Sequence, residues 1–193
     1  KQSGRCPNCG ARLPQILLTE QEKDSVRTEL FSIANNTSKG QGDAIKAFGQ
    51  WLDAKAQAGL EYTYIVDGAN VAYHRQNFDG GKFNFRQIEL VVQQLQSEME
   101  KRKKATATAS GGEGQGREEE IGLAEGKILV LVPYPYAQKV VPNSSRHRKG
   151  RKIEYLSQQE QAILSKFEAE DMLYVVPQGG NDDWFWVYAT IHK

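Results

Sequence analysis

Long hydrophobic runs are missing from this sequence. No apolar stretch approaches the length of a membrane-spanning helix, and the first residues, KQSGRCPNCG, contain no hydrophobic signal segment. These absences argue against a membrane partner. The chain also begins with Lys1 rather than Met, which indicates a fragment or a processed chain.

An excess of charge of either sign is missing as well. Lys and Arg together number 25 and Asp and Glu 24, for a net charge of +1. The overall charge therefore indicates no class of partner, and any argument for nucleic-acid binding must rest on local basic patches. With 39% hydrophobic and 25% charged residues, the composition is ordinary for a soluble protein, and 193 residues suffice for one domain and a small appendage.

Cysteine is scarce, and both cysteines lie in the motif CPNCG, as Cys6 and Cys9. They are too close together for an ordinary stabilising disulfide, and their spacing is typical of half of a structural zinc site. The other half is not evident, because His74, His147 and His192 are scattered. A redox pair is the alternative, but the motif does not lie between a strand and a helix start. Reduced cysteines of this kind favour an intracellular compartment.

The segment 19–60 is expected to be helical. Thr19 and Glu22 have the spacing of a capping box, which marks the start of a helix. The turn-like stretch NNTSKGQGD then separates this helix from a second one. Apolar residues recur at helical spacing in both helices: Val26, Leu30 and Ile33 in the first, and Ile45, Phe48, Trp51 and Leu52 in the second.

Strands and helices alternate from residue 61 onward. KILVLV, residues 127–132, is a continuous apolar run closed by Pro133, as expected for a strand buried on both faces. The alternation predicts an α/β fold, a Rossmann-like parallel sheet with flanking helices. The expected strands are 62–66, 127–132 and 173–176, and the expected helices begin near Asn84, near Leu156 and at Asp182.

Two further features bear on the organisation of this part. The segment 103–126 is rich in Gly, Ala and Glu and poor in aromatic residues, which predicts a flexible insertion. In the last helix, Trp184, Val187, Tyr188 and Ile191 share one helical face. We expect that face to pack in the core.

Acidic residues follow two of the expected strands. Asp67 comes directly after the first strand, and Asp182 and Asp183 follow the third across the loop PQGGN. Ligands of open α/β sheets bind at the carboxyl ends of the strands, so we expect these carboxylates at one edge. Clustered acids raise each other's pKa unless a cation lies between them. Oxygen ligands of this kind suit Mg²⁺ or Mn²⁺.

Simpler roles are open for the same residues. Asn181, Asp182 and Asp183 are residue types that cap helices and complement the helix dipole, and Asp67 is typical of a turn. Asn70 is expected either to orient a ligand or to serve as a cap or turn residue. Capping does not exclude metal binding, because a carboxylate has several lone pairs.

A basic stretch, SSRHRKGRK at 144–152, follows the second strand and would emerge on the same edge. It is expected either to grip RNA phosphates or to be a solvated loop. A second basic run, at 101–104, is expected to be solvated and to complement a helix dipole, and His74 to be an exposed loop residue. The candidate RNA-binding residues are Arg146, His147, Arg148, Lys149, Arg151 and Lys152.

The motifs YIVDGANVAY and GGNDDWFWVYAT together resemble the NYN-type metallonuclease domain, related to PIN nucleases, of protein-only RNase P. CPNCG and FGQWLD extend the resemblance over most of the chain outside 103–126. The resemblance implies that Asp67, Asp182 and Asp183 are metal ligands. It also implies that residues 1–18 belong to a zinc-binding central domain and that 61–193 form a nuclease domain that is incomplete at its carboxyl end. Upstream helical repeats, a further catalytic Asp and the remaining zinc ligands would then lie outside this chain.

The activity implied is Mg²⁺-dependent removal of the 5′ leader of precursor tRNA. One or two Mg²⁺ or Mn²⁺ ions would activate a water that attacks the phosphodiester. Precursor tRNA would be the partner, with no obligatory protein partner, in the mitochondrion, plastid or nucleus. A fragment of this extent need not be active alone. The alternatives are another NYN or PIN-type RNA nuclease and a catalytically silent RNA-binding module stabilised by zinc.

Overall fold

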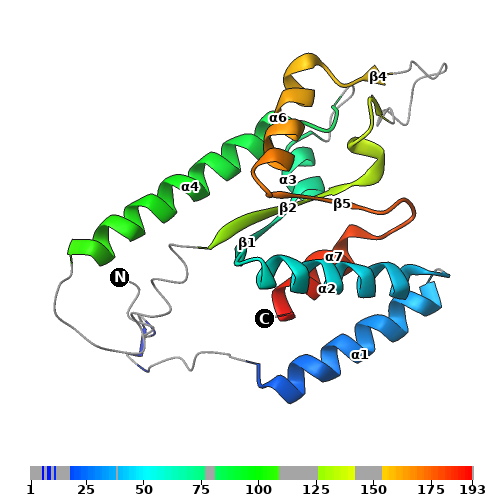
Figure 1. Ribbon diagram of the computed structural model, residues 1–193, viewed down its shortest axis with the longest axis vertical. Coiled ribbons are helices and arrows are strands. Elements are labelled where there is room, and N and C mark those ends of the chain that lie inside the picture. Colours follow the sequence, from blue (N-terminus) through cyan, green and yellow to red (C-terminus); the bar gives the residue numbers. More distant parts are fainter. Residues whose placement is uncertain are drawn as a thin grey trace.

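A three-stranded parallel sheet forms the centre of the computed structural model (Figure 1). Its strands are β1 (Tyr62–Asp67), β2 (Lys127–Pro133) and β5 (Leu173–Val176), in the order β1-β2-β5. The predicted α/β fold with a parallel sheet is thereby confirmed. The structure describes residues 6, 8–9, 11, 18–37, 39–76, 81–108, 126–141 and 154–192.

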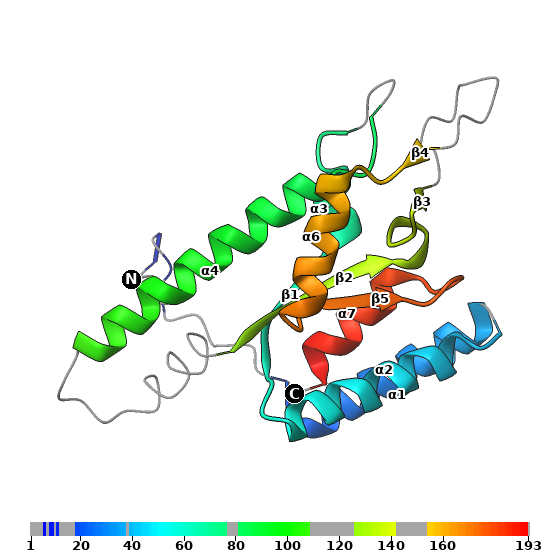
Figure 2. The ribbon, with the colours of Figure 1, turned by 45° about the horizontal axis from the view of Figure 1, so that its top comes forward.

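Helices cover both faces of the sheet, as the sequence predicts (Figure 2). One face is covered by α1 (Glu20–Thr37), α2 (Gln41–Gln57) and α7 (Asp182–Ile191). The other face is covered by α3 (Gly68–Tyr73), α4 (Phe85–Thr108) and α6 (Gln158–Ala169).

The central strand β2 divides its side chains between two cores. Ile128, Val130 and Val132 pack with α3, α4 and α6. Leu129 and Leu131 pack with α1, α2 and α7, on the opposite face. All five are almost fully buried, and each contributes about 1.5–3 kcal/mol by burial. The continuous apolar run at 127–132 is therefore explained by helices on both sides of the strand.

Local signals fix the helix ends. The Thr19 backbone N–H donates to Glu22 Oε2 at 2.7 Å, and the Glu22 N–H donates to Thr19 Oγ1 at 3.3 Å, which confirms the predicted capping box. Near the carboxyl end of the chain, the carbonyl oxygen of Ile191 in α7 accepts a hydrogen bond from Arg27 Nη2 of α1 at 2.7 Å. This guanidinium satisfies a terminal carbonyl of α7 and places a cation at the negative end of its dipole.

The buried face of α7 differs from the predicted one. Tyr188 and Ile191 are buried as expected, but Phe185 and Ala189 complete the face, and Trp184 is only partly buried. Because α7 is wedged between the sheet and helices α1 and α2, its inner face is rotated toward Phe185. The ring centroids of Phe185 and Phe48 of α2 are 5.4 Å apart.

Short elements were not expected from the sequence. They are α3, the 3-10 turn η1 (Tyr134–Tyr136), and an antiparallel pair of β3 (Val140–Val141) and β4 (Glu154–Tyr155). All are too short for hydrophobic periodicity to reveal. The helix α4 continues to Thr108, so residues 103–108 are helical. The rest of the expected insertion, 109–125, lies outside the described residues.

Candidate active site

Asp67 ends β1 and is at the same time the N-cap of α3. The turn between strand and helix requires glycine at the next position, because a Cβ on Gly68 would lie 2.4 Å from the Leu131 carbonyl oxygen. The amino end of α3 thus packs directly on the backbone of β2. This close approach leaves the Asp67 carboxylate at the carboxyl edge of the sheet.

Asn70 holds both oxygens of the Asp67 carboxylate. Its backbone N–H donates to Oδ1 at 2.9 Å and its side-chain Nδ2 donates to Oδ2 at 2.7 Å. The carboxylate is therefore fixed in orientation by a residue one helical turn away. Each oxygen retains a lone pair for a second partner, so this cap leaves Asp67 able to bind a cation.

Asp182 and Asp183 form the first turn of α7. Asn181 is the N-cap residue, and its Oδ1 accepts a hydrogen bond from the Asp183 N–H at 3.1 Å. Asp182 is half-buried, whereas Asp183 is exposed. Asp183 Oδ1 accepts a hydrogen bond from Trp186 Nε1 at 3.2 Å, so the two neighbouring carboxylates have different surroundings.

The charges of Asp67 and Asp182 act on each other. The pKa of Asp182 is raised, first by burial and then by the negative charges of Asp67 and Asp183, against the lowering effect of backbone N–H groups of α7. Residues far apart in the sequence, on β1 and after β5, thus meet at one edge of the sheet. Their charge repulsion is a property that a bound cation would remove.

The Asp67 and Asp182 carboxylates are ligands of the kind that Mg²⁺ prefers. Magnesium in proteins is held by one or two carboxylates together with water and substrate phosphates, rather than by a complete protein cage. Within the residues that the structure describes, no group of three or more His, Cys, Asp or Glu side chains could hold a metal ion. Asp67 and Asp182 would therefore be the main ligands, with Asp183 turned toward Trp186.

The loop between β5 and α7 is anchored by a residue that the sequence did not reveal. Gln41, at the start of α2, donates from Nε2 to the Gly179 carbonyl oxygen at 2.8 Å. It is the one buried polar residue among those described, at 8% exposure. Gly179 has a φ of 80°, in the left-handed region that favours glycine. A glutamine at a helix start carries no sequence signal for such a role.

Of the CPNCG segment, the structure describes Cys6, Asn8 and Cys9, and the last two lie in a turn. The Cys6 N–H donates to the Ala11 carbonyl oxygen at 2.8 Å. The pKa of the Cys6 thiol is lowered by hydrogen bonds from the backbone of Cys9 and Asn8 and from the Cys9 side chain. Both thiols are free of disulfides, and a favoured thiolate suits metal binding. Zinc binding by this pair stays a prediction.

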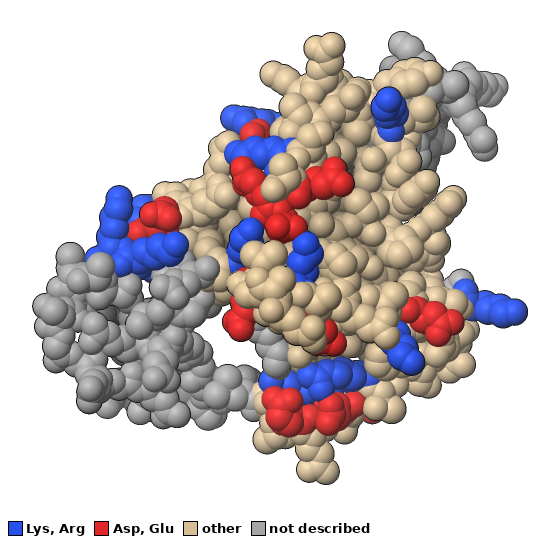
Figure 3. All heavy atoms as spheres, in the orientation of Figure 1, with Lys and Arg blue, Asp and Glu red and all other residues tan. Residues whose placement is uncertain are grey.

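The predicted RNA-binding residues Arg146, His147, Arg148, Lys149, Arg151 and Lys152 lie outside the described residues. On the face seen in Figure 3, the Lys and Arg side chains lie among Asp and Glu side chains, so no single sign dominates there. His74 is exposed in a turn after α3, as expected. None of the described helices has the length and apolar character that spanning a membrane would require.

The class of fold is shared with nuclease structures. In the crystal structure of nuclear proteinaceous RNase P 2 from Arabidopsis thaliana, 30% of the chain matches 99% of this chain, with a TM-score of 0.61 and 24% identity. Another solved structure of Arabidopsis nuclear protein-only RNase P 2 gives a TM-score of 0.59 at 23% identity. These matches confirm the predicted fold.

Two curated proteins are similar in sequence as well. Proteinaceous RNase P 2 of Arabidopsis thaliana is 25% identical over 190 residues, which cover 97% of this chain and 29% of the relative. Proteinaceous RNase P 3 of the same plant is 24% identical over 194 residues, which cover 97% of this chain and 26% of that relative. No family model matches the chain. The resemblance to proteinaceous RNase P is thus confirmed, over less than a third of the length of these relatives.

Proposed function

We propose that this protein is a metal-dependent endoribonuclease that removes the 5′ leader from precursor tRNA. The observation that carries the proposal is the meeting of Asp67 and Asp182 at the carboxyl edge, where their charges repel. Ligands bind at this edge in open α/β sheets. The similarity to two curated RNase P proteins indicates which reaction such a site would serve.

Asp67 and Asp182 would be the main ligands of one or two Mg²⁺ or Mn²⁺ ions, with Asp183 beside them in the first turn of α7. Such ions, when bound, lower the pKa of a water ligand and stabilise charge on phosphate and leaving-group oxygens. The chain's own residues position these ligands. Asn70 fixes both Asp67 oxygens, and Asn181 caps the helix that carries Asp182. A nucleophilic side chain is not required, since phosphodiester cleavage depends mainly on charge stabilisation.

The remaining contacts belong to the same proposal. Arg146, His147, Arg148, Lys149, Arg151 and Lys152 would bind RNA phosphates, since they lie between β3 and β4, in the connection that follows the carboxyl end of β2. Cys6 and Cys9 would contribute half of a structural zinc site whose other ligands come from elsewhere in a longer protein. No obligatory protein partner is needed in this scheme.

Labelled precursor tRNA tests the proposal directly. The chain would be incubated with the RNA and Mg²⁺, with and without EDTA, beside Asp182→Asn and a matched control, Asp43→Asn. Like Asp182, Asp43 lies in the first turn of a helix, α2, but its carboxylate is exposed and remote from Asp67 in the sequence. We expect leader release by the wild type and Asp43→Asn, and none by Asp182→Asn or with EDTA.

A second readout covers the case in which the chain cleaves only as part of a longer protein. Mg²⁺ or Mn²⁺ binding is measured calorimetrically on the same three proteins, and cleavage is repeated in the longer chain. Equal metal affinity in wild type and Asp182→Asn, without leader release by the longer chain, would refute the proposal. Cleavage of unstructured RNA at many positions would instead favour a nuclease with another target.

A further inference from the structure

The chain leaves the carboxyl end of β2 through η1 and then forms the β3–β4 pair. We call residues 134–141 and 154–155 together the hairpin arm. The strand β2 lies between β1, which ends in Asp67, and β5, which leads to Asp182. Pro133 pairs with Val176 at the end of the ladder, so Tyr134 is the first residue beyond this edge. Figure 2 shows β3 and β4 beyond the end of β2, on the side where β5 turns into α7.

Apolar side chains gather on this arm. Tyr134 is 38% exposed, Val140 48% and Tyr155 68%. The other large exposed hydrophobic residues among those described are scattered. Leu18 precedes α1, Ile33 lies in α1 and Leu90 lies in α4. Scattered exposed apolar residues need no explanation, whereas a cluster on one projecting element marks an interaction site.

The arm is held firmly at its base. Tyr136 of η1 stacks on Phe83, with ring centroids 4.2 Å apart and planes at 12°. The Tyr73 and Tyr136 hydroxyls are 2.9 Å apart, and Tyr73 ends α3, the helix that Asp67 caps. Aromatic contacts thus tie the arm to the element that begins at the proposed metal ligand.

The outer strand of the arm is anchored in the same way. The Leu156 N–H donates to the Lys139 carbonyl oxygen at 3.0 Å, and the Leu156 side chain is buried at 5% exposure. Tyr155, the preceding residue, ends β4, pairs with Val140 of β3 and is 68% exposed. Its ring is therefore displayed on a fixed backbone, which reduces the entropic cost of using it to bind a ligand.

We propose that Tyr134 and Tyr155 form a stacking surface for unpaired bases of single-stranded RNA beside the cleavage site. The placement rests on the proposed function, whereas the stacking itself does not require cleavage. Every base has an aromatic face, so such a surface binds single strands with little sequence preference. Without metal, as in the binding test below, the acidic edge repels phosphates, so contacts to bases are the favourable way to hold RNA there.

A folded protein partner fits this surface less well. A stable protein interface buries about 800 Å² on each partner, and two tyrosines with one valine offer far less. The sequence that joins β3 to β4 contains Arg146, Arg148 and Arg151, which complements the charge of a nucleic acid. Single-stranded RNA therefore matches both the apolar rings and their basic sequence neighbourhood.

The test compares an intact short single-stranded RNA with an abasic oligonucleotide of the same length and charge. Affinity is measured by fluorescence anisotropy with EDTA present, so that no cleavage occurs. We expect Tyr155→Ala and Tyr134→Ala each to weaken binding of the intact RNA about fivefold or more. Binding of the abasic strand should not change. Tyr155→Phe should bind like wild type, while Tyr155→Leu, which is apolar but not aromatic, should not.

Ile33→Ala serves as the control, because it removes an exposed apolar side chain from α1. Far-UV circular dichroism verifies that each variant is folded. Wild-type protein that binds the intact and abasic strands equally would overturn the proposal, as would tyrosine variants that bind intact RNA normally. A dimer in light scattering that Tyr155→Ala abolishes would assign the surface to a second copy instead.

These outcomes are independent of the catalytic proposal. Weaker RNA binding by the tyrosine variants, together with equal metal affinity in wild type and Asp182→Asn and no leader release by the longer chain, would refute the nuclease but keep the RNA-binding surface. Normal affinity in the tyrosine variants, combined with metal-dependent cleavage, would refute the surface and keep the nuclease.

Discussion

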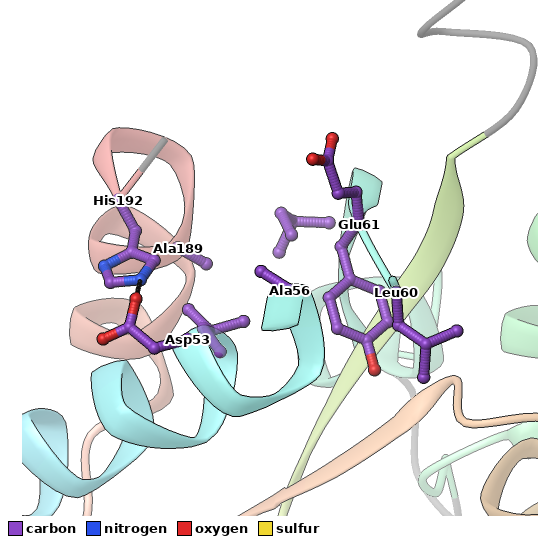
Figure 4. Close-up of a pocket in the computed structure, with 9 residues that line it drawn as sticks. Asp53, Ala56, Leu60, Glu61, Ala189 and His192 are labelled. Atoms are coloured by element: carbon purple, nitrogen blue, oxygen red, sulfur yellow. Dashed lines mark hydrogen bonds and ion pairs between the residues drawn. The ribbon is translucent and has the colours of Figure 1, made fainter. Parts of the chain in front are cut away.

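The two edges of the sheet place acidic residues in opposite situations. At the amino edge, a cavity of about 350 Å³ lies among α2, α7 and the start of β1. There Asp53 Oδ1 lies 3.0 Å from His192 Nε2, so the carboxylate has a partner that can carry positive charge (Figure 4). At the carboxyl edge, Asp67 and Asp182 face each other's negative charge.

The comparison shows that acidic residues lie in two different electrostatic surroundings at the two edges of one sheet. The amino-edge cavity is lined largely by apolar residues, and its Asp53 and His192 side chains pair with each other. The carboxyl edge holds acids whose mutual repulsion costs folding free energy. Retaining charge where it destabilises the fold is typical of functional sites.

The largest expected effect comes from Asp182→Asn. This change removes a proposed metal ligand, and we expect it to lower Mg²⁺-dependent cleavage about a hundredfold or more. It should also raise the melting temperature of the metal-free protein, because a half-buried charge near Asp67 is lost. Cleavage assays and calorimetry in EDTA measure the two effects. A variant that is both inactive and less stable would contradict the repulsion that defines this edge.

Gly68→Ala should rank next. The new Cβ would lie 2.4 Å from the Leu131 carbonyl oxygen, so backbone must shift, at a cost of about 1–3 kcal/mol. The shift should move Asp67 and weaken metal binding, measured by calorimetry.

Gly59→Ala is the control for this change, because Gly59 has open space around it and a left-handed φ of 79° that alanine tolerates poorly. It should lower stability without changing metal affinity. Similar metal affinities for the two alanine variants would show that the β1–α3 turn does not position the site.

The pH dependence of stability should carry the signature of the carboxyl edge. Since the folded-state pKa of Asp182 is raised, this residue stabilises the protein when protonated, and that contribution is lost as pH rises through the folded pKa. Without metal, wild type should be less stable than Asp182→Asn at neutral pH, and the gap should close on acidification. Urea unfolding at several pH values measures this difference in the free energy of unfolding. A difference that grows in acid would exclude the effect of burial on Asp182.

The smallest effect is expected at the amino edge. Asp53→Asn removes a partly exposed pair with His192, and such pairs contribute about 0–1 kcal/mol. Stability should fall slightly, and cleavage should be unchanged. A large loss of cleavage in this variant would break the contrast between the two edges.

The sequence predicted the parts of the fold that depend on long, regular patterns. The apolar run ending at Pro133 was recognisable because β2 is covered on both faces. The placement of Asp67 and Asp182 followed from the rule that parallel strands end at one edge. Both inferences use the order of elements rather than their detailed packing.

What sequence reasoning missed depends on contacts between distant segments. Gln41 supports the loop before α7 through one hydrogen bond to Gly179, and no spacing in the sequence indicates this. The inner face of α7 is rotated toward Phe185 because α7 packs at once against α1, α2 and the sheet. The hairpin arm is held by Tyr136 and Leu156, whose partners are set by the tertiary fold.

Both ends of α7 have hydrogen-bond partners within the protein, which bears on how the fold would respond to loss of a metal ion. Asn181 caps its first turn, and Arg27 binds the carbonyl oxygen of Ile191 at its last. The ends of the helix that carries Asp182 are therefore satisfied without a metal ion, unlike those of a small zinc module that unfolds when its metal leaves. We therefore expect the scaffold to stay folded when the proposed Mg²⁺ ion is removed.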